Sequence, residues 1–325
     1  VTTLSLPSMI MLKKAVKKTA LPLFASFGVT AAVLLLRQKI CLTLANRHAD
    51  DTPHIIYKTD GISAAYEVQG HGSPIVLLHS MHLGASRREW RPQIENLAKE
   101  YRVYSIDMVG YGQSDKPKKP WTAYQYAIFL HQFLTDVVNS PAVVVAANGG
   151  ADIALVLSML YPTDIKKMIL ISPEGIGQGF ATPQDTEPLK KLLLPVAGTQ
   201  IFLDNTTKKS IERMAKQLFW QTERMPADFV ENLYHNARYG KGAKASFVSY
   251  RTRFFAADTK RAFSELSVPF LLIWGEKNEI NPIQYLEQAE AMQDKGEFLL
   301  FEDTASLPHL ENPKAFYRIM IEFLK

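Results

Sequence analysis

The sequence predicts an α/β fold: a mostly parallel sheet flanked by helices, with a helical insertion late in the chain. Short, continuous apolar runs such as PIVLLH (74–79) and AVVVAA (142–147) are typical of parallel strands that are covered on both faces. A helical pattern follows each such run, and this alternation indicates a parallel sheet between two helical layers. From about residue 175 to 265 the alternation stops, and amphipathic helical segments replace it.

The individual elements follow from the same patterns. Two short alternating strands, near Ile55–Lys58 and Ser63–Val68, begin the domain, with Asp60-Gly61 as the turn between them. Before the insertion we then expect strands at 74–79, 102–107, 142–147 and 167–172, and helices at 89–98, within 120–139 and up to 161. The insertion includes helices at 208–220 and 226–239. After it we expect strands at 268–274 and 297–301, and helices near 282–293 and at 313–325.

Length and charge limit the classes of function. The chain has 325 residues, which suits a single α/β domain with an insertion. Seven of the 37 Lys and Arg residues but only one of the 32 acids lie in residues 1–50, so residues 51–325 hold 30 basic and 31 acidic residues. The basic character belongs to the N-terminal tail, which favours a membrane surface over a nucleic-acid partner. A single cysteine, Cys41, excludes a disulfide framework or a thiolate metal site within one chain.

Residues 1–50 are expected to form a basic tail and membrane anchor, and residues 51–325 the folded domain. Thr19–Leu36 holds 18 uncharged residues, with four lysines before it and Arg37 and Lys39 after it. At ~1.5 Å rise each, this length is near the lower limit for crossing a hydrocarbon core of ~30 Å. We favour an uncleaved anchor over a cleaved signal peptide or an ordinary buried helix. The slight excess of lysines before the segment favours a domain outside the cytoplasm.

Five stretches, in order along residues 55–325, resemble the α/β-hydrolase fold family with a helical cap. LLHS (77–80) stands where the family has a strand ending in His-Gly, and DMVGYGQSDKP (107–117) resembles its Asp-x-x-Gly-x-Gly-x-Ser loop. AANGGADIAL (146–155) stands at the nucleophile elbow, Gly-x-Ser-x-Gly. VPFLLIWGEKN (268–278) resembles the strand that ends in the catalytic acid, and TASLPHLENP (304–313) the loop with the catalytic histidine. The resemblance implies a cap, at about 175–265, over the carboxyl edge of the sheet.

The three positions that carry the catalytic triad in this family hold Asn148, Asn278 and Ser306. A carboxamide at the elbow is a poor nucleophile, although Asn tolerates the positive φ of an elbow better than most residues. Asn278 supplies no charge to stabilise an imidazolium, and Ser306 cannot shuttle a proton. Each register is set by its own local motif, so a single misalignment does not explain all three. The resemblance therefore predicts an inactive triad in a retained frame.

Further residues are candidates for a binding site. The backbone N–H groups of Met81 and Gly149 would form the oxyanion hole that the resemblance implies, so the pocket would keep the donors for a carbonyl or carboxylate. Ser80 replaces the family's glycine and adds a side chain where a ligand approaches. His79, at the end of a central strand, is expected to be a buried structural residue, and His82 on the next loop is a candidate for facing the pocket.

Two more residues complete the candidate list. Glu174 follows the strand after which some relatives of this fold place their acid. His309 stands in a Pro-His setting that is usually non-catalytic in the family. Deamidation of Asn148-Gly149 would create an aspartate of the kind that dehalogenases and epoxide hydrolases use, but that chemistry also needs the histidine.

Three hypotheses follow. The favoured one is a membrane-anchored pseudo-hydrolase that binds a small apolar or carbonyl-containing ligand, or a membrane protein partner, without turnover. The second is an active esterase or lipase-type hydrolase that acts on a small apolar ester through Ser80, His82, His309 and Glu174. The third is a structural subunit of a membrane complex. The sequence shows no metal-ligand spacing and no phosphate-binding glycine loop, so no metal or other cofactor is expected.

Overall fold

The computed structural model describes residues 32–41, 43–44, 53–177, 191–192 and 194–325. The chain divides into two compact units, residues 1–44 and residues 45–325. In the first unit, residues 32–41 are helical, and most of the predicted anchor at 19–36 lies outside the described residues. Within the described residues, no helix is both long enough and apolar enough to cross a membrane.

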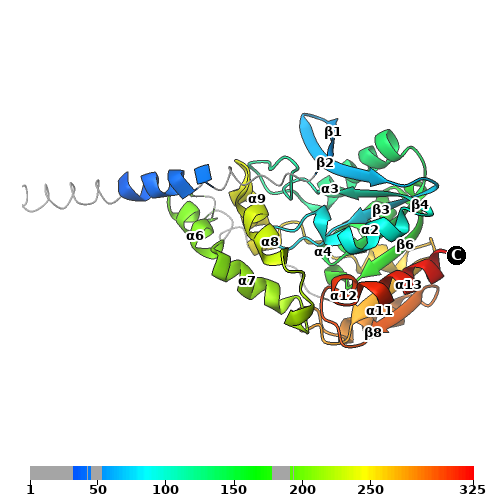
Figure 1. The fold of residues 1–325 in the computed structure, drawn as a ribbon. Coiled ribbons are helices and arrows are strands. Elements are labelled where there is room, and N and C mark those ends of the chain that lie inside the picture. Colours follow the sequence, from blue (N-terminus) through cyan, green and yellow to red (C-terminus); the bar gives the residue numbers. More distant parts are fainter. Residues whose placement is uncertain (1–31, 42, 45–52, 178–190, 193) are drawn as a thin grey trace, which may run out of the picture. The chain divides into compact units, whose positions relative to one another are not determined.

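The second unit is built on one eight-stranded sheet (Figure 1). Its strands run in the order β1-β2-β4-β3-β5-β6-β7-β8. Strands β1 and β2 form an antiparallel hairpin whose turn residues, Asp60 and Gly61, have φ of 49° and 74°. Strand β2 pairs antiparallel with β4, and the remaining pairs are parallel. The strands are β1 Ile55–Thr59, β2 Ile62–Gln69, β3 Ser73–Leu78, β4 Tyr101–Ile106, β5 Ala142–Ala147, β6 Ile165–Ile171, β7 Phe270–Gly275 and β8 Glu297–Phe301.

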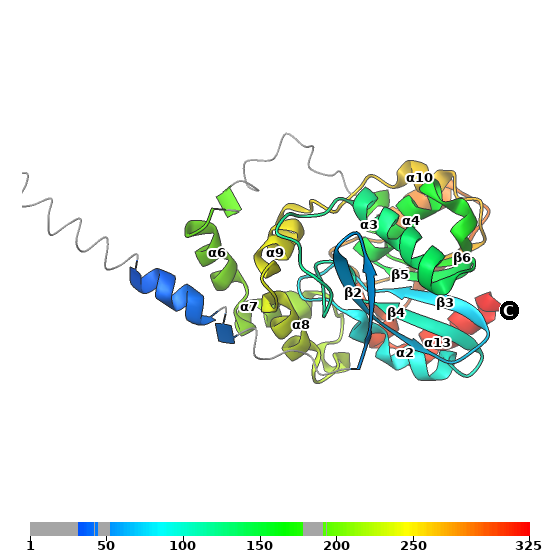
Figure 2. The same ribbon diagram turned by 90° about the horizontal axis from the view of Figure 1, so that it is seen from above.

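Helices cover both faces of this sheet (Figure 2). On one face lie α3 (Ala123–Phe133), followed by a π turn (η2, Leu134–Val138), and α4 (Gly149–Leu160). On the other face, α2 (Arg91–Leu97) packs beside α13 (Pro313–Leu324). Successive residues of β5 point to opposite faces, so Val144 joins the first core and Val145 the second. The predicted mostly parallel sheet between two helical layers is confirmed.

Helix boundaries show local capping chemistry. The predicted helix at 89–98 is a 3-10 turn (η1, Arg87–Trp90) followed by α2, because Pro92 stands in the first turn, where a helix tolerates proline. The helix predicted within 120–139 begins after Thr122, which forms a capping box with Gln125, and ends at Asn139, which has φ of 54°.

Between β6 and β7 the described residues form only helices and connecting segments. They are η4 (Glu174–Ile176), α6 (Ala197–Asn205), α7 (Lys208–Gln217), η5 (Thr222–Arg224), α8 (Phe229–Arg238), α9 (Ala243–Thr252) and α10 (Lys260–Ser264). After β7 come α11 (Gln284–Met292) and, beyond β8, α12 (Pro308–Glu311). Helices α6 to α9 lie apart from the sheet as a separate layer, which corresponds to the expected cap (Figures 1 and 2).

The connection order determines where side chains gather. Strand β3 lies between β4 and β5 and is parallel to both, so the chain passes from β3 to β4 on one side of β3 and then returns past β3 to β5 on its other side. Such a switch point opens a crevice at the carboxyl ends of the strands. The loop after β3 carries His79 to His82, and the turn after β5 carries Asn148. Residues far apart in the sequence are therefore neighbours at this edge.

Candidate functional site

Asn148 forms the sharp turn from β5 into α4. Its φ of 49° and ψ of −123° lie in a region that glycine occupies readily and other residues rarely adopt. The backbone N–H of Asn148 donates to the carbonyl of Ile171 at the end of β6, at 2.8 Å, which holds the turn on the sheet. The strained backbone geometry of an elbow is therefore present at Asn148.

The side chains of Asn148, Ser306 and Asn278 lie at one place, although they follow three different strands. The carboxamide Nδ2 of Asn148 donates to the carbonyl of Ser306 at 3.2 Å. The Ser306 hydroxyl donates to Oδ1 of Asn278 at 2.9 Å. All three residues are buried. The tertiary structure thus brings together the three residues that the sequence places at the triad positions. Ser306, in the loop after β8, lies between the elbow residue Asn148 and Asn278, which follows β7.

The loop that carries Ser306 is fixed to the cap. The N–H of Ser306 donates to the carbonyl of Leu218, just after α7, at 3.1 Å. Glu311 accepts N–H groups from Ala305 at 2.6 Å on one oxygen and from Trp220 at 2.9 Å on the other. Burial raises the pKa of the Glu311 carboxyl, and these N–H donors only partly offset that effect. Glu311 is therefore the junction between the cap and the Ser306 loop.

Met81 and Gly149, the predicted oxyanion residues, adjoin each other. A Cβ added to Gly149 would lie 2.9 Å from the Cβ of Met81 and 2.7 Å from the ring of Phe255, so the side chain of Met81 packs directly on this glycine. The carbonyl of Met81 accepts the hydroxyl of Tyr111 at 3.2 Å, which positions the loop after β3. A Cβ on the next glycine, Gly150, would lie 2.4 Å from the carbonyl of His79, so α4 contacts that loop backbone to backbone.

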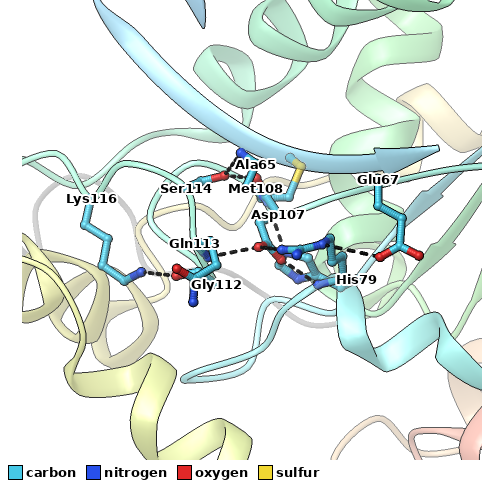
Figure 3. Close-up of polar contacts among 10 residues, drawn as sticks. Ala65, Glu67, His79, Asp107, Met108, Gly112, Gln113, Ser114 and Lys116 are labelled. Atoms are coloured by element: carbon cyan, nitrogen blue, oxygen red, sulfur yellow. Dashed lines mark hydrogen bonds and ion pairs between the residues drawn. The ribbon is translucent and has the colours of Figure 1, made fainter. Parts of the chain in front are cut away.

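His79 connects the ends of two strands (Figure 3). Its Nε2 accepts the N–H of Met108 at 3.0 Å, and its Nδ1 lies 2.5 Å from the carbonyl of Ser80. Both ring nitrogens are thus occupied by backbone groups, so His79 offers neither to a ligand.

The loop after β4 is held by Asp107 (Figure 3). Its carboxylate accepts the N–H groups of Arg87 at 2.7 Å and of Gln113 at 2.9 Å, and it pairs with the buried Arg87 guanidinium. Gly112 has φ of 43°, and a Cβ there would lie 2.2 Å from the Asp107 carboxyl carbon. Glycine is therefore required for the loop to close around this carboxylate.

Ser80 and His309 meet through a residue that the motifs did not identify, Glu89. The Ser80 hydroxyl donates to Oε2 of Glu89 at 2.6 Å, and Nε2 of His309 lies 3.0 Å from Oε1. The imidazole of His309 stacks on Trp90 with ring centroids 4.5 Å apart. Burial alone would raise the pKa of Glu89, but the hydrogen bond and charge of His309 and the Ser80 hydroxyl outweigh it and lower the pKa. Glu89 is therefore an ionised carboxylate between a hydroxyl and an imidazole.

Glu174 lies at the entry to the cap, in a second acidic cluster. Its carboxylate pairs with Arg253, which follows α9 at the other end of the cap. The neighbouring Asp152 accepts the N–H of Glu174 at 3.2 Å and that of Gly175 at 2.8 Å, and the hydroxyl of Thr259 at 3.3 Å. Burial and the nearby charge of Glu174 raise the pKa of Asp152 well above its usual value. The cluster joins the two segments that connect cap and core.

His82 faces a cavity of about 140 Å³ between the loop after β3 and the cap helix α8. The side chain is 6% exposed, and its Nε2 has no hydrogen-bond partner among the described residues. Burial lowers the pKa of the imidazole, although the charges of Glu174 and Glu89 oppose this effect, so His82 is neutral near pH 7. His82 thus lines a cavity beside the cap, and its expected role in a pocket at the triad positions stays a prediction.

The contact partners Glu89, Arg253 and Glu311 were not identified from the sequence as site residues. Each acts through a contact between segments more than 75 positions apart, and no local motif records such a contact. Within the described residues, no group of three or more His, Cys, Asp or Glu side chains could hold a metal ion. The absence of a cofactor remains a prediction.

A family model described as the alpha/beta hydrolase fold matches residues 73–313. Among curated relatives, an uncharacterized protein of Mycobacterium tuberculosis is 22% identical over 281 residues, which span 84% of this chain and 81% of that protein. A monoacylglycerol lipase of Homo sapiens is 22% identical over 263 residues, or 78% and 76% of the two chains.

Solved structures give the same fold. A meta-cleavage product hydrolase from Pseudomonas fluorescens superposes with a TM-score of 0.69 at 19% identity, covering 83% of this chain and 97% of the other. A membrane phospholipase A, described as a bacterial virulence factor, superposes with a TM-score of 0.66 at 18% identity, covering 97% and 98%. At these identities the likeness shows the architecture alone.

Proposed function

The chain belongs to the α/β-hydrolase fold family, and from this premise we propose that it is a non-catalytic member that binds a small apolar or carbonyl-containing molecule under its cap. One observation carries the proposal. The side chain at the strained elbow, Asn148, is hydrogen-bonded to the backbone of the Ser306 loop, and Ser306 in turn is bonded to Asn278. This chain of contacts contains two carboxamides and a hydroxyl.

The usual reaction of this fold needs a nucleophile bonded to an imidazole that a carboxylate orients. Neither carboxamide nor hydroxyl accepts a proton near neutral pH, so the contacts from Asn148 to Asn278 provide no general base. The Nδ2 of Asn148 is a donor, which gives this side chain the role of a positioning group. The geometry of the elbow is kept while the means of activating a nucleophile are absent from these three residues.

Binding capacity is supported by the backbone and the neighbouring cavity. The loop after β3 and the first turn of α4, which carry Met81 and Gly149, pack against each other as an oxyanion hole requires. The N-terminus of a helix also favours a carbonyl oxygen or anion. The cavity beside His82 opens next to this loop.

A membrane location of this protein is part of the same proposal and rests on the sequence of residues 19–36. The uncharged stretch between basic flanks supports attachment to a membrane, with the domain on the extracytoplasmic side. An anchored protein that binds without turnover would present its ligand, or a membrane protein partner, at the bilayer surface.

The test is an assay of the full chain against short-chain aryl esters. We expect turnover indistinguishable from buffer for the natural protein. The triple variant Asn148→Ser, Asn278→Asp, Ser306→His should gain hydrolysis, because it restores a nucleophile, an acid and a general base to positions that are already in contact. General-base catalysis alone contributes roughly 10²-fold to 10⁴-fold.

A matched control separates chemistry from changes in packing. The double variant Asn278→Asp, Ser306→His keeps Asn148 and should show no gain. Turnover by the natural protein would overturn the proposal. A folded triple variant without activity would show that the three residues do not stand at the triad positions.

A second candidate function, an esterase with non-standard residues, is favoured by one observation, the buried cluster of Ser80, Glu89 and His309. In this cluster the carboxylate of Glu89 lies between the hydroxyl of Ser80 and the imidazole of His309. Activation of a serine nucleophile needs the opposite order, with the imidazole between the hydroxyl and the carboxylate. Ester turnover by the natural protein that disappears in His309→Asn or His82→Leu would establish this function instead.

A further inference from the structure

We infer that the cavity beside His82 is a binding site for a small neutral molecule that is mostly hydrocarbon and carries one hydroxyl group, as a monocyclic phenol does. The inference rests on the proposed function, since it assumes a ligand that stays intact. The cavity is a separate site from the triad positions, because its lining includes none of Asn148, Asn278 and Ser306.

The walls of the cavity come from both the core and the cap. On the cap side, Phe229 and Leu233 of α8 supply an aromatic and an aliphatic surface, and Leu310 and Pro92 face them from the core. Gly84 has φ of 82°, and a Cβ there would lie 2.1 Å from the carbonyl of Leu233. The loop after β3 therefore touches the backbone of α8 directly, and the cavity is enclosed at that side.

Among the described residues, Nε2 of His82, a side chain in these walls, has no protein hydrogen-bond partner and is almost completely buried. Two other buried polar groups in the lining already have partners, since the Ser80 hydroxyl donates to Glu89 and Glu89 is bonded to His309. A buried polar nitrogen without a partner costs free energy, and a ligand group that bonds to it removes that cost. A hydroxyl both donates and accepts, so it satisfies Nε2 in either tautomer of a neutral imidazole.

Two carboxylates, Glu89 and Asp228, and two cations, Arg88 and Arg91, line the cavity, so its formal charge is balanced. A ligand anion placed beside the buried Glu89 would be repelled. At the rim, Arg88 donates to Asn232 at 2.7 Å and Arg91 pairs with Asp228 at 3.6 Å, so both cations bridge to residues at or beside α8. These contacts join core and cap beside the cavity.

Size limits the ligand further. The volume of about 140 Å³ is close to that of an apolar cavity of ~150 Å³ that holds benzene. A single six-membered ring with a hydroxyl therefore fits, whereas a long acyl chain or a fused polycyclic ring system does not. The ring would lie among Phe229, Leu233 and Leu310, with the hydroxyl on His82.

The experiment is calorimetric titration of the full chain with phenol, toluene and benzoate. We expect saturable binding of phenol, binding of toluene weaker by about fivefold to tenfold, and no binding of benzoate. In the His82→Leu variant, the affinity for phenol should fall to that for toluene, and the affinity for toluene should change little. The matched control is His71→Leu, an exposed histidine at the opposite end of β3, which should bind as the natural protein does.

A direct measurement does not depend on the variants. With methyl-labelled protein, phenol protons should show nuclear Overhauser effects to Leu233 and Leu310, and these remain decisive if His82→Leu does not fold. Equal binding of phenol and toluene, absence of saturable binding, or contacts to other methyl groups would overturn the inference. If the protein neither binds phenol nor hydrolyses esters, this inference fails but the proposed function stands. If the protein hydrolyses phenyl acetate, the proposed function fails, whether or not phenol binds.

Discussion

Two hydrogen-bonded groups of three residues, called here the uncharged chain and the charged chain, share the segment after β8 and differ in charge. In one, Asn148 reaches the backbone of Ser306, which donates to Asn278. In the other, Ser80 and His309 bind opposite oxygens of Glu89. The segment after β8 takes part in both, since Ser306 lies in the loop before α12 and His309 in α12 itself, three residues apart.

The two groups differ in the order of their contacts as well as in their residue types. The first chain has the elbow geometry of a catalytic site but only uncharged groups. The second has a hydroxyl, a carboxylate and an imidazole, but the carboxylate occupies the middle position and the imidazole is stacked on Trp90. The second arrangement stabilises the packing of the loop after β3 against α12, and it does not deprotonate Ser80.

The largest effect on stability should come from the charged chain. Glu89→Ala leaves the Ser80 N–H and hydroxyl and His309 Nε2 buried without their acceptor. We expect the unfolding free energy to fall by about 3 kcal/mol or more. Urea denaturation measures this change, with Glu95→Ala on the exposed side of α2 as the control. A loss equal to that of the control would mean that the Glu89 contacts do not hold this region together.

In the hydrogen-bonded group of Asn148, Ser306 and Asn278, we expect a substitution of Asn148 to change stability mainly through backbone strain. Asn148→Ala removes the bond to Ser306 and places a residue at φ of 49° that tolerates it poorly. We expect a loss of about 1 to 2 kcal/mol. Asn148→Gly removes the same hydrogen bond but relieves the backbone, so it should lose less. Equal losses in the two variants, measured by the same denaturation, would show that strain at the elbow is unimportant.

Ser306→Ala should have a smaller effect. It removes only the bond to Asn278, whose Oδ1 still accepts the N–H of Asn281 at 3.0 Å. Because no buried acceptor is left empty, we expect a loss of about 0.5 to 1 kcal/mol. A thermal unfolding series on Ser306→Ala and Ser306→Cys checks this. A loss as large as that of Glu89→Ala would contradict the view that this chain is a weak contact.

The smallest expected effect is a pH dependence of the unfolding free energy that comes from Glu311. Glu311 holds the segment after β8 that carries Ser306 and His309. Its pKa is raised in the folded state above the ordinary value of 4.5, so the folded protein binds the proton more tightly than the unfolded chain. The unfolding free energy should therefore fall as pH rises from 4.5 through the raised pKa. Asp152, whose pKa is also raised, adds a slope of the same sign, so Glu311→Gln should show a shallower slope than the natural protein between pH 4 and 7. A parallel slope in both proteins would assign the dependence to other groups.

Local patterns were enough for most strands of this fold. The strands at 142–147 and 297–301 were predicted to the residue, because a short apolar run between turn residues has few other solutions. The positions of Asn148, Asn278 and Ser306 also followed from local motifs, and the structure places them in contact. Sequence patterns did not show the division of the helix near residue 89 into η1 and α2, or the partners of His309.

The sequence by itself determined the class of the fold, the residues at the ends of its strands and the chemical limits of Asn148, Asn278 and Ser306, because these depend on residue type and local periodicity. Only the tertiary structure decided that Glu89 lies between Ser80 and His309, that Glu311 joins cap and core, and that Nε2 of His82 is buried beside a cavity without a partner among the described residues. Each of these depends on a contact between distant segments, and such a contact leaves no periodic signal along the chain.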